Sequence, residues 1–266
     1  MIKADLHVHS TISDGSFTVD EILPMAKEKG LTHIAFTEHD TTEGHEYAVR
    51  KAMEFGITAI PAIEISAMDY HTGVKAHILG YGYKKTYQIE RYCIGILEMR
   101  NKNSLKQIEI LKELGYQITP EELGRGSRCI YKQHIMAHLV KTGQVADMFG
   151  EFYQSTFKNG GACDFDITYM PVKVAVEIIT EDGGTAVLAH PLQQDNLYLV
   201  EKLVPYGLKG IECNHPSTPE NRKSEILDLC MKHKLIVTGG SDFHGKYAAV
   251  DTDMGEIYAS VLENIH

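Results

Sequence analysis

The sequence has no Cys-x-x-C pair, no apolar run long enough to cross a bilayer, and no charged-then-apolar leader. Its five cysteines are scattered, so they are interpreted as reduced thiols that fill the core of a cytoplasmic protein. The missing apolar run and leader exclude a membrane span and a signal peptide. We therefore expect a cytoplasmic protein without a membrane partner.

The chain also has no excess of basic over acidic residues. The chain has 26 Lys and Arg against 36 Asp and Glu, which gives a formal net charge of −10 with neutral histidine. This charge argues against a stable, non-specific complex with nucleic acid. It does not exclude a phosphorylated substrate, because bound metal ions would reverse the local charge. A length of 266 residues with 43% hydrophobic content suits one large α/β domain with an insert.

Strand and helix patterns alternate over residues 1–86 and 166–266, which predicts a parallel sheet with helices outside. Strands are expected at 2–8, 33–37, 57–65, 74–81, 185–189, 210–213 and 235–238, and helices at 18–30, 42–55, 171–180, 196–204 and 219–233. Residues 87–165 show only helical patterns, at 87–114, from 119, at 130–141 and at 145–157. We expect this segment to be a helical insert that caps the site.

Histidines and carboxylates follow the predicted strands. His7 and His9 lie two apart on a strand, so they share one face. Further groups stand at the ends of later strands or within them: Thr37-Glu38-His39-Asp40, Glu64, His77 inside the strand at 74–81, Ala189-His190-Pro191, Glu212-Cys213-Asn214-His215 and Asp242-Phe243-His244. Carboxyl ends of parallel strands face one side, so these groups should converge. Without metal they would be a costly group of polar side chains, whereas two or three zinc, manganese or iron ions would satisfy them.

The segments DLHVHS, TEHD, the strand end at Glu64, AHP and GSDFHG, in this order, resemble the PHP (polymerase and histidinol phosphatase) family over nearly the whole chain. The resemblance implies an α/β fold, a distorted (β/α)7 barrel of PHP type at 1–86 and 166–266, with an all-helical insert or cap at 87–165. The insert resembles that of small metal-dependent phosphoesterases, some of which act on nucleoside phosphates and others as exoribonucleases.

The resemblance also implies three metal sites. The first is held by His7, His9, Glu64 and Asp242. Glu64 bridges to the second, which His77 and His190 complete. Asp14, His39 and His244 hold the third. Each ion then keeps open positions for water and substrate, as catalytic sites do.

Substrate and proton-transfer groups are also expected. Related phosphoesterases carry Arg-Pro-His at the start of a cap helix, where Lys132-Gln133-His134 stands here. The candidate substrate-binding residues are Arg125, Arg128, Lys132, His134 and Asn214. Lysine gives a point charge instead of arginine's bidentate fork, so phosphate binding can differ from the family pattern. His215 and Asp40 are the two candidates for the acid that protonates the leaving group.

Together these features predict a metal-dependent phosphoesterase. The expected reaction is hydrolysis of a phosphate monoester in a small metabolite, a nucleoside monophosphate or 3′,5′-bisphosphate, by water activated between two ions. The alternatives are 5′-to-3′ removal of nucleotides from short RNA and hydrolysis of histidinol phosphate. A regulatory metal-binding domain is disfavoured, since every ligand position holds a competent residue.

Overall fold

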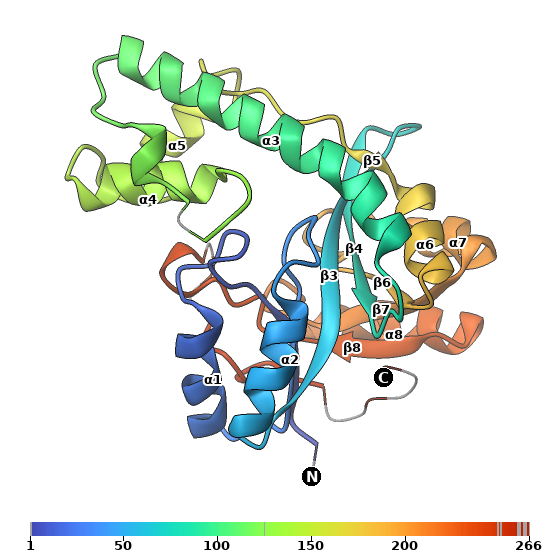
Figure 1. Cartoon of the computed structure of the whole chain (residues 1–266). Helices are drawn as coiled ribbons and strands as arrows, with labels where there is room; N and C mark the ends of the chain where they lie inside the picture. Colours follow the sequence, from blue (N-terminus) through green and yellow to red (C-terminus); the bar gives the residue numbers. More distant parts are fainter. Residues whose placement is uncertain are drawn as a thin grey trace.

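A computed structural model describes residues 2–124, 126–248, 250, 252–259, 262 and 265. One sheet has the strand order β1-β2-β3-β4-β6-β7-β8, and β5 pairs with β3 (Figure 1). The strands are β1 (Ala4–Val8), β2 (His33–Phe36), β3 (Thr58–Asp69), β4 (Val74–Tyr81), β5 (Met170–Pro171), β6 (Thr185–Leu188), β7 (Leu208–Asn214) and β8 (Ile236–Gly239). The α-helices are α1 (Val19–Glu28), α2 (His45–Glu54), α3 (Tyr87–Glu113), α4 (Lys132–Lys141), α5 (Glu151–Thr156), α6 (Val172–Glu181), α7 (Leu199–Leu203) and α8 (Lys223–His233).

Local sequence signals account for helix α1. Thr18 and Glu21 form a capping box, in which the Thr18 N–H donates to Glu21 Oε2 at 2.8 Å and the Glu21 N–H donates to Thr18 Oγ1 at 3.3 Å. The buried residues Val19, Ile22, Leu23 and Ala26 recur at helical spacing, so α1 turns one apolar face to the sheet.

The expectation of a wholly parallel sheet is wrong for β4, which runs antiparallel to both β3 and β6. Only residues 70–73 separate β3 from β4, and so short a connection makes a hairpin because a parallel crossover needs a dozen or more residues. The hairpin also extends β3 to Asp69, so Glu64 lies within the strand rather than at its end. Because β4 runs back, His77 lies opposite Ser66.

The sheet curls into a distorted, partly closed barrel, which confirms the predicted fold class. Strand β1 meets the segment that follows β8 through a parallel bridge between Val8 and Phe243, where the backbone N–H of His9 donates to the Phe243 carbonyl at 2.9 Å. Gly240 permits this approach, because a Cβ there would lie 2.4 Å from the His7 nitrogen. The carboxyl ends of β1 and β8 are thereby held side by side.

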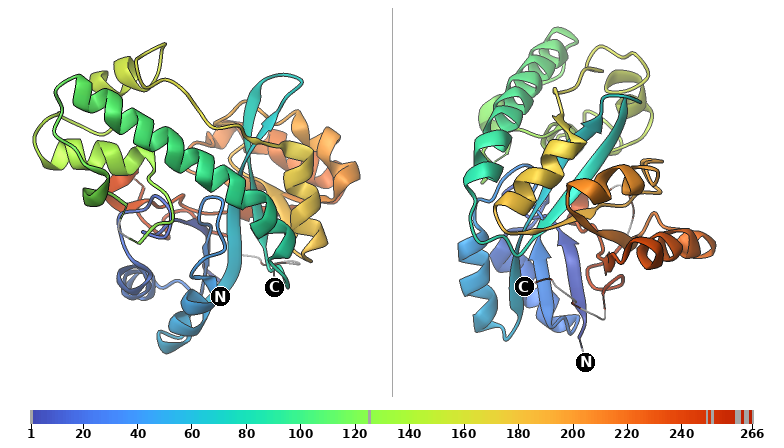
Figure 2. Two further views of the ribbon diagram at one scale, coloured as in Figure 1. Left: turned by 45° about the horizontal axis from the view of Figure 1, so that its top comes forward. Right: turned by 90° about the vertical axis from the view of Figure 1, so that its right-hand side faces the viewer.

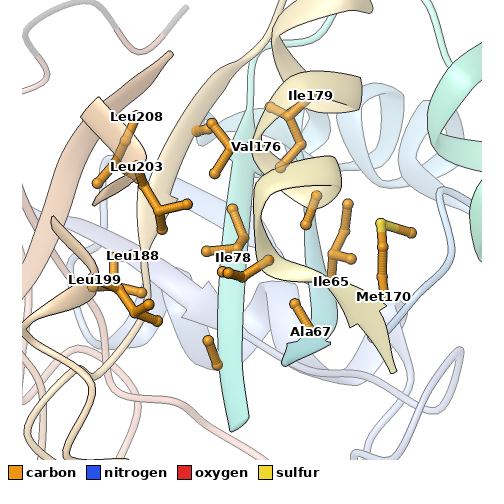
Figure 3. Packing of buried hydrophobic residues seen from close by; sticks show 14 of the residues in the cluster. Ile65, Ala67, Ile78, Met170, Val176, Ile179, Leu188, Leu199, Leu203 and Leu208 are labelled. Carbon is orange, nitrogen blue, oxygen red and sulfur yellow. The ribbon is translucent and has the colours of Figure 1, made fainter. Parts of the chain in front are cut away.

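The largest core cluster lies between the sheet and the helices α3, α6, α7 and α8, and Figure 3 shows part of it. Val176 and Ile179 of α6 point toward Ile78 and Ile65 on the strands, and all four are fully buried. The described cysteines are all buried and free, as core-filling thiols should be.

Residues 87–165 contain α3, a 3-10 turn at Pro120–Glu122, α4 and α5. Figures 1 and 2 show these helices at the end of the molecule where the β3–β4 hairpin tip also lies. The helix expected at 145–157 is shorter than predicted, because the Asp147 side chain accepts the Gly150 N–H and holds a turn before α5. The helix expected from 119 is only the 3-10 turn. Among the described residues, no helix combines the length and apolar character that a bilayer span requires.

Candidate metal centre

Glu64 lies at the middle of a buried group of histidines. Its Oε2 is 3.2 Å from His7 Nε2 and 3.2 Å from His9 Nε2, while Asp242 Oδ1 lies 3.3 Å from His7 Nε2. Strand β1 supplies His7, the residue after that strand's end supplies His9, and the loop after β8 supplies Asp242. These four residues can therefore present their ligand atoms to one metal ion.

The other oxygen of Glu64 faces a second group. Glu64 Oε1 lies 2.7 Å from His77 Nδ1 and 3.0 Å from His190 Nε2, and the two imidazole nitrogens are 3.3 Å apart. His77 comes from β4 and His190 follows β6. One carboxylate that offers its two oxygens to two histidine groups is the arrangement of a bridging ligand in a two-metal site.

Asp14 is the centre of a third group. Its Oδ1 lies 3.3 Å from His244 Nε2 and 3.7 Å from His9 Nδ1, and its Oδ2 lies 3.7 Å from His39 Nε2. His39 also places Nδ1 3.3 Å from Glu64 Oε2. The structure thus brings together all nine expected ligands, with His9 and His39 between neighbouring groups. Their assignment to individual ions remains a prediction.

The carboxylates of this cluster are held in the ionised form that metal binding requires. Burial disfavours the Glu64 charge, but His77, His7 and His39 outweigh it and hold the pKa of Glu64 well below its ordinary value. The pKa of Asp14 is lowered in the same way, against its burial, by His244 and His39.

Three buried imidazole nitrogens around Glu64 Oε2 make no hydrogen bond among the described residues: His7 Nε2, His9 Nε2 and His39 Nδ1. Buried polar atoms are normally satisfied, so such a group at one place indicates a missing binding partner. Imidazole and carboxylate are suitable ligands for zinc, manganese and iron. The residues present therefore fit a multi-metal centre.

Two glutamates outside the predicted ligand set support it. Glu212 Oε1 lies 2.9 Å from the ring nitrogen Nδ1 of His7. Glu212 Oε2 accepts a hydrogen bond of 2.9 Å from the backbone N–H of His190. A carboxylate on the far nitrogen orients a metal-binding imidazole. Glu38 accepts hydrogen bonds from the Ser10 and Ser13 hydroxyls, both at 2.5 Å, and so fixes the loop that carries Asp14.

The structure separates the two acid candidates. His215 lines the pocket formed by His39, Glu64, His77, His190, Asp242 and His244, called here the metal pocket, and its Nε2 lies 3.4 Å from Asp242 Oδ2. Asp40 is instead engaged on both oxygens, by the Ser66 N–H at 2.8 Å and by Arg100 at 2.6 Å. We therefore keep His215 as the candidate acid and interpret Asp40 as a structural partner of Arg100.

The expected substrate-binding residues are dispersed. Lys132 lines a second cavity beside the metal pocket. Arg128 pairs with the exposed Glu43 at 2.9 Å, and His134 accepts the Tyr131 N–H at 3.2 Å, so both are used locally. Asn214 ends β7 and is absent from the described lining of both cavities. Arg125 lies outside the described residues.

Sequence reasoning overlooked four charged residues of the second cavity: Lys75, Arg100, Lys158 and Asp166. The sequence could have identified Lys75 as a residue near the site, because it lies two residues before His77 on β4 and therefore points to the same face of the sheet. Arg100 had none, since a single arginine in the long helix α3 matches no motif.

Chelation should destabilise the protein if the cluster holds metal, because an ion that binds only the folded state adds its binding free energy to folding. We expect removal of the ions to lower the melting temperature by about 5–10 °C, as for a loss of about 2–3 kcal/mol in a domain of this size. Scanning calorimetry with and without chelator, and elemental analysis of the untreated protein, check this. An unchanged melting temperature in protein that contained metal would contradict it.

Comparisons with known proteins agree with this geometry. The PHP domain matches residues 5–179. The phosphoribosyl 1,2-cyclic phosphate 1,2-diphosphodiesterase of Eggerthella lenta is 44% identical over 250 residues, 92% of this chain and 95% of that protein. The 3′,5′-nucleoside bisphosphate phosphatase of Chromobacterium violaceum is 29% identical over 262 residues, 92% of this chain and 88% of that protein.

A solved structure agrees as well. A crystal structure described as a putative metal-dependent phosphoesterase from Bifidobacterium adolescentis superposes with a TM-score of 0.87 at 25% identity, covering 96% of this chain and 91% of the other. The matched domain, the relatives and the histidine–carboxylate cluster lead to one conclusion. The chain belongs to the PHP domain family of metal-dependent phosphoesterases.

Proposed function

We propose that this protein hydrolyses a cyclic phosphate diester on a phosphorylated ribose, with phosphoribosyl 1,2-cyclic phosphate as the substrate to test first. The observation that carries the phosphoesterase chemistry is the position of Glu64, whose two oxygens face two histidine groups. The ribose substrate comes from the similarity to the Eggerthella lenta enzyme, which extends over nearly both chains. This choice replaces the nucleotide monoester as the first candidate.

The reaction would add water to phosphorus, break one P–O bond of the ring and leave a phosphate monoester on the sugar. Divalent ions at the cluster would activate the water and neutralise charge on the phosphoryl oxygens. Glu212 orients the His7 ring through Nδ1, so that Nε2 of His7 is available to bind metal. His215 lies in the pocket wall, where it can donate a proton to the sugar oxygen that leaves.

A nucleoside 3′,5′-bisphosphate is the second candidate substrate. Phe149 and Tyr247 line the metal pocket, and an aromatic wall suits stacking of a nucleobase. The similarity to the Chromobacterium violaceum phosphatase also supports this candidate, at lower identity.

The test compares kcat/KM of manganese-loaded protein on the cyclic ribose phosphate, a nucleoside 3′,5′-bisphosphate, histidinol phosphate and a 5′-phosphorylated five-nucleotide RNA. We expect the cyclic ester to be preferred by about a hundredfold, since a site that pairs each polar group of its substrate rejects analogues by this much or more. Phosphorus NMR identifies the products. Faster release of phosphate from the bisphosphate, or stepwise release of mononucleotides from the RNA, would overturn the assignment in favour of those activities.

A further inference from the structure

The ring of His39 is held differently from that of His7. Glu212 orients the His7 ring through one nitrogen and leaves the other available to bind metal. In His39, Nδ1 lies 3.3 Å from Glu64 Oε2 and Nε2 lies 3.7 Å from Asp14 Oδ2, so both ring nitrogens face groups of the metal cluster. A metal-binding imidazole is normally oriented by a hydrogen bond at its second nitrogen. Because both nitrogens of His39 face the cluster, the orientation of this ring depends on its backbone.

The peptide group between His39 and Asp40 is held at both of its polar atoms. The Asp40 N–H donates to the Glu64 carbonyl at 2.9 Å. The His39 carbonyl accepts the hydroxyl of Tyr131 at 2.9 Å. Asp40 has a φ of 56°, in the left-handed region that residues other than glycine adopt only where their surroundings hold them. The first of these hydrogen bonds comes from the barrel, but the second comes from the helical insert.

Tyr131 is itself fixed in place. It is 2% exposed and directly precedes α4, and its N–H donates to His134 Nδ1 at 3.2 Å. The Arg100 guanidinium of α3 lies 4.9 Å from the centre of the Tyr131 ring, within the range of a cation–π contact. The same Arg100 binds Asp40 at 2.6 Å. Side chains from α3 and from the start of α4 therefore meet at the peptide after His39, where the phenol of Tyr131 acts as a donor.

We propose that the helical insert is a structural part of the metal centre, in which Tyr131 is the positioning residue that holds His39 for its ion. Tyr131 does not bind the ion and acts only through the His39 carbonyl. Loss of its hydroxyl removes the donor from this carbonyl and leaves the His39 peptide held at its N–H side alone. The inference rests on His39 as a metal ligand. It goes beyond the proposed function, because it is independent of the ester that is hydrolysed.

The Tyr131 hydrogen bond couples docking of the insert to binding of the ion. A contact that tightens metal binding must itself be strengthened by metal to the same degree, because binding free energies are linked reciprocally. Metal at His39 should therefore secure the insert on the barrel, and removal of the metal should loosen residues 87–165. The inference thus predicts effects at two places, at the metal ligand and in the helices of the insert.

The first test measures how tightly the ion is held. Cobalt-loaded protein is titrated with a chelator while the visible spectrum of the bound cobalt is followed, and His39→Ala identifies the ion concerned. Tyr131→Phe removes the hydroxyl and keeps the ring, and we expect it to weaken binding of that ion by about tenfold or more, as for other lost supports of a metal ligand. Tyr83→Phe is the matched control and should keep the wild-type affinities. Tyr83 is 6% exposed, and its hydroxyl donates at 3.1 Å to the carbonyl of Ala62, which is not an expected metal ligand.

The second test measures how far the ion secures the insert. Hydrogen exchange of residues 87–165 is compared between metal-loaded and chelated protein. We expect metal to slow exchange in the wild type and in Tyr83→Phe, and this protection to fall by about tenfold in Tyr131→Phe, the same factor as the affinity. Unchanged metal affinity in Tyr131→Phe, or an equal loss in Tyr83→Phe, would overturn the inference. Neither measurement uses turnover, so a failure of the proposed reaction would leave the inference standing.

Discussion

Substitution of Glu64 by glutamine should reduce kcat/KM by at least about 10³-fold, the largest loss that we expect from any single change. Glutamine keeps the shape of the side chain but removes the charge that faces His7 and His9 on one side and His77 and His190 on the other. Without this carboxylate, no charged oxygens face both histidine groups from one side chain, so the bridging ligand is lost. Activity, metal content by elemental analysis and circular dichroism are the measurements.

Two further variants make this result interpretable. Glu212→Gln removes a carboxylate that orients His7 without being in the predicted ligand set, so a smaller loss of about 10–100-fold is expected. Glu225→Gln changes an exposed glutamate paired with Arg222 and should leave activity unchanged. A metal-replete Glu64→Gln protein with nearly wild-type turnover would show that Glu64 does not carry the reaction.

Substitution of Arg100 by methionine should destabilise the fold by about 3–5 kcal/mol, because it leaves a buried carboxylate without its cation. Asp40 is fully buried, and Arg100 reaches it from α3 at 2.6 Å and also donates to Ser66 Oγ at 2.9 Å. Burial opposes the Arg100 charge, but Asp40 outweighs it and raises the pKa of the guanidinium. The pair therefore ties the helical insert to the loop that carries His39.

Urea unfolding of the chelated protein measures this effect. The double variant Arg100→Met with Asp40→Leu should recover much of the loss, since removal of both charges leaves neither unpaired. Arg50→Met is the control, because Arg50 forms an exposed pair with Glu46, and its loss should change stability by less than about 1 kcal/mol. A loss in Arg100→Met no larger than in Arg50→Met would mean that the pair does not hold the insert.

Local patterns in the sequence predicted much of the barrel. The Thr18–Glu21 capping box marked the start of α1, and the apolar runs marked the strands, because these signals act within a few residues. The direction of β4 was missed, since a short apolar run does not specify its pairing and the short hairpin connection was not recognised. The extent of α5 was missed because a single turn at Asp147 competed with a helical pattern.

The residues of the candidate site, like the elements of the fold, were predicted only in part from the sequence. His7, His9 and the later histidines could be identified because strand ends on one side of an α/β sheet meet in space. Lys132 was a candidate because Lys132-Gln133-His134 stands where related phosphoesterases carry Arg-Pro-His, and its role remains a prediction. Arg128 and His134 were equally plausible from the sequence, but both are used locally. A charged residue in a helix can face solvent, a neighbour or a cavity, and only packing distinguishes these cases.

The sequence by itself determined the family and the barrel class, and it supplied the set of candidate metal ligands, because each is encoded in short segments whose chemistry does not depend on distant contacts. The tertiary structure decided how these residues are connected. It placed the two oxygens of Glu64 against different histidines, paired Asp40 with Arg100, and brought Lys132 into the lining of a cavity beside the metal pocket. These facts depend on distances between residues far apart in the chain, which only the packed fold fixes.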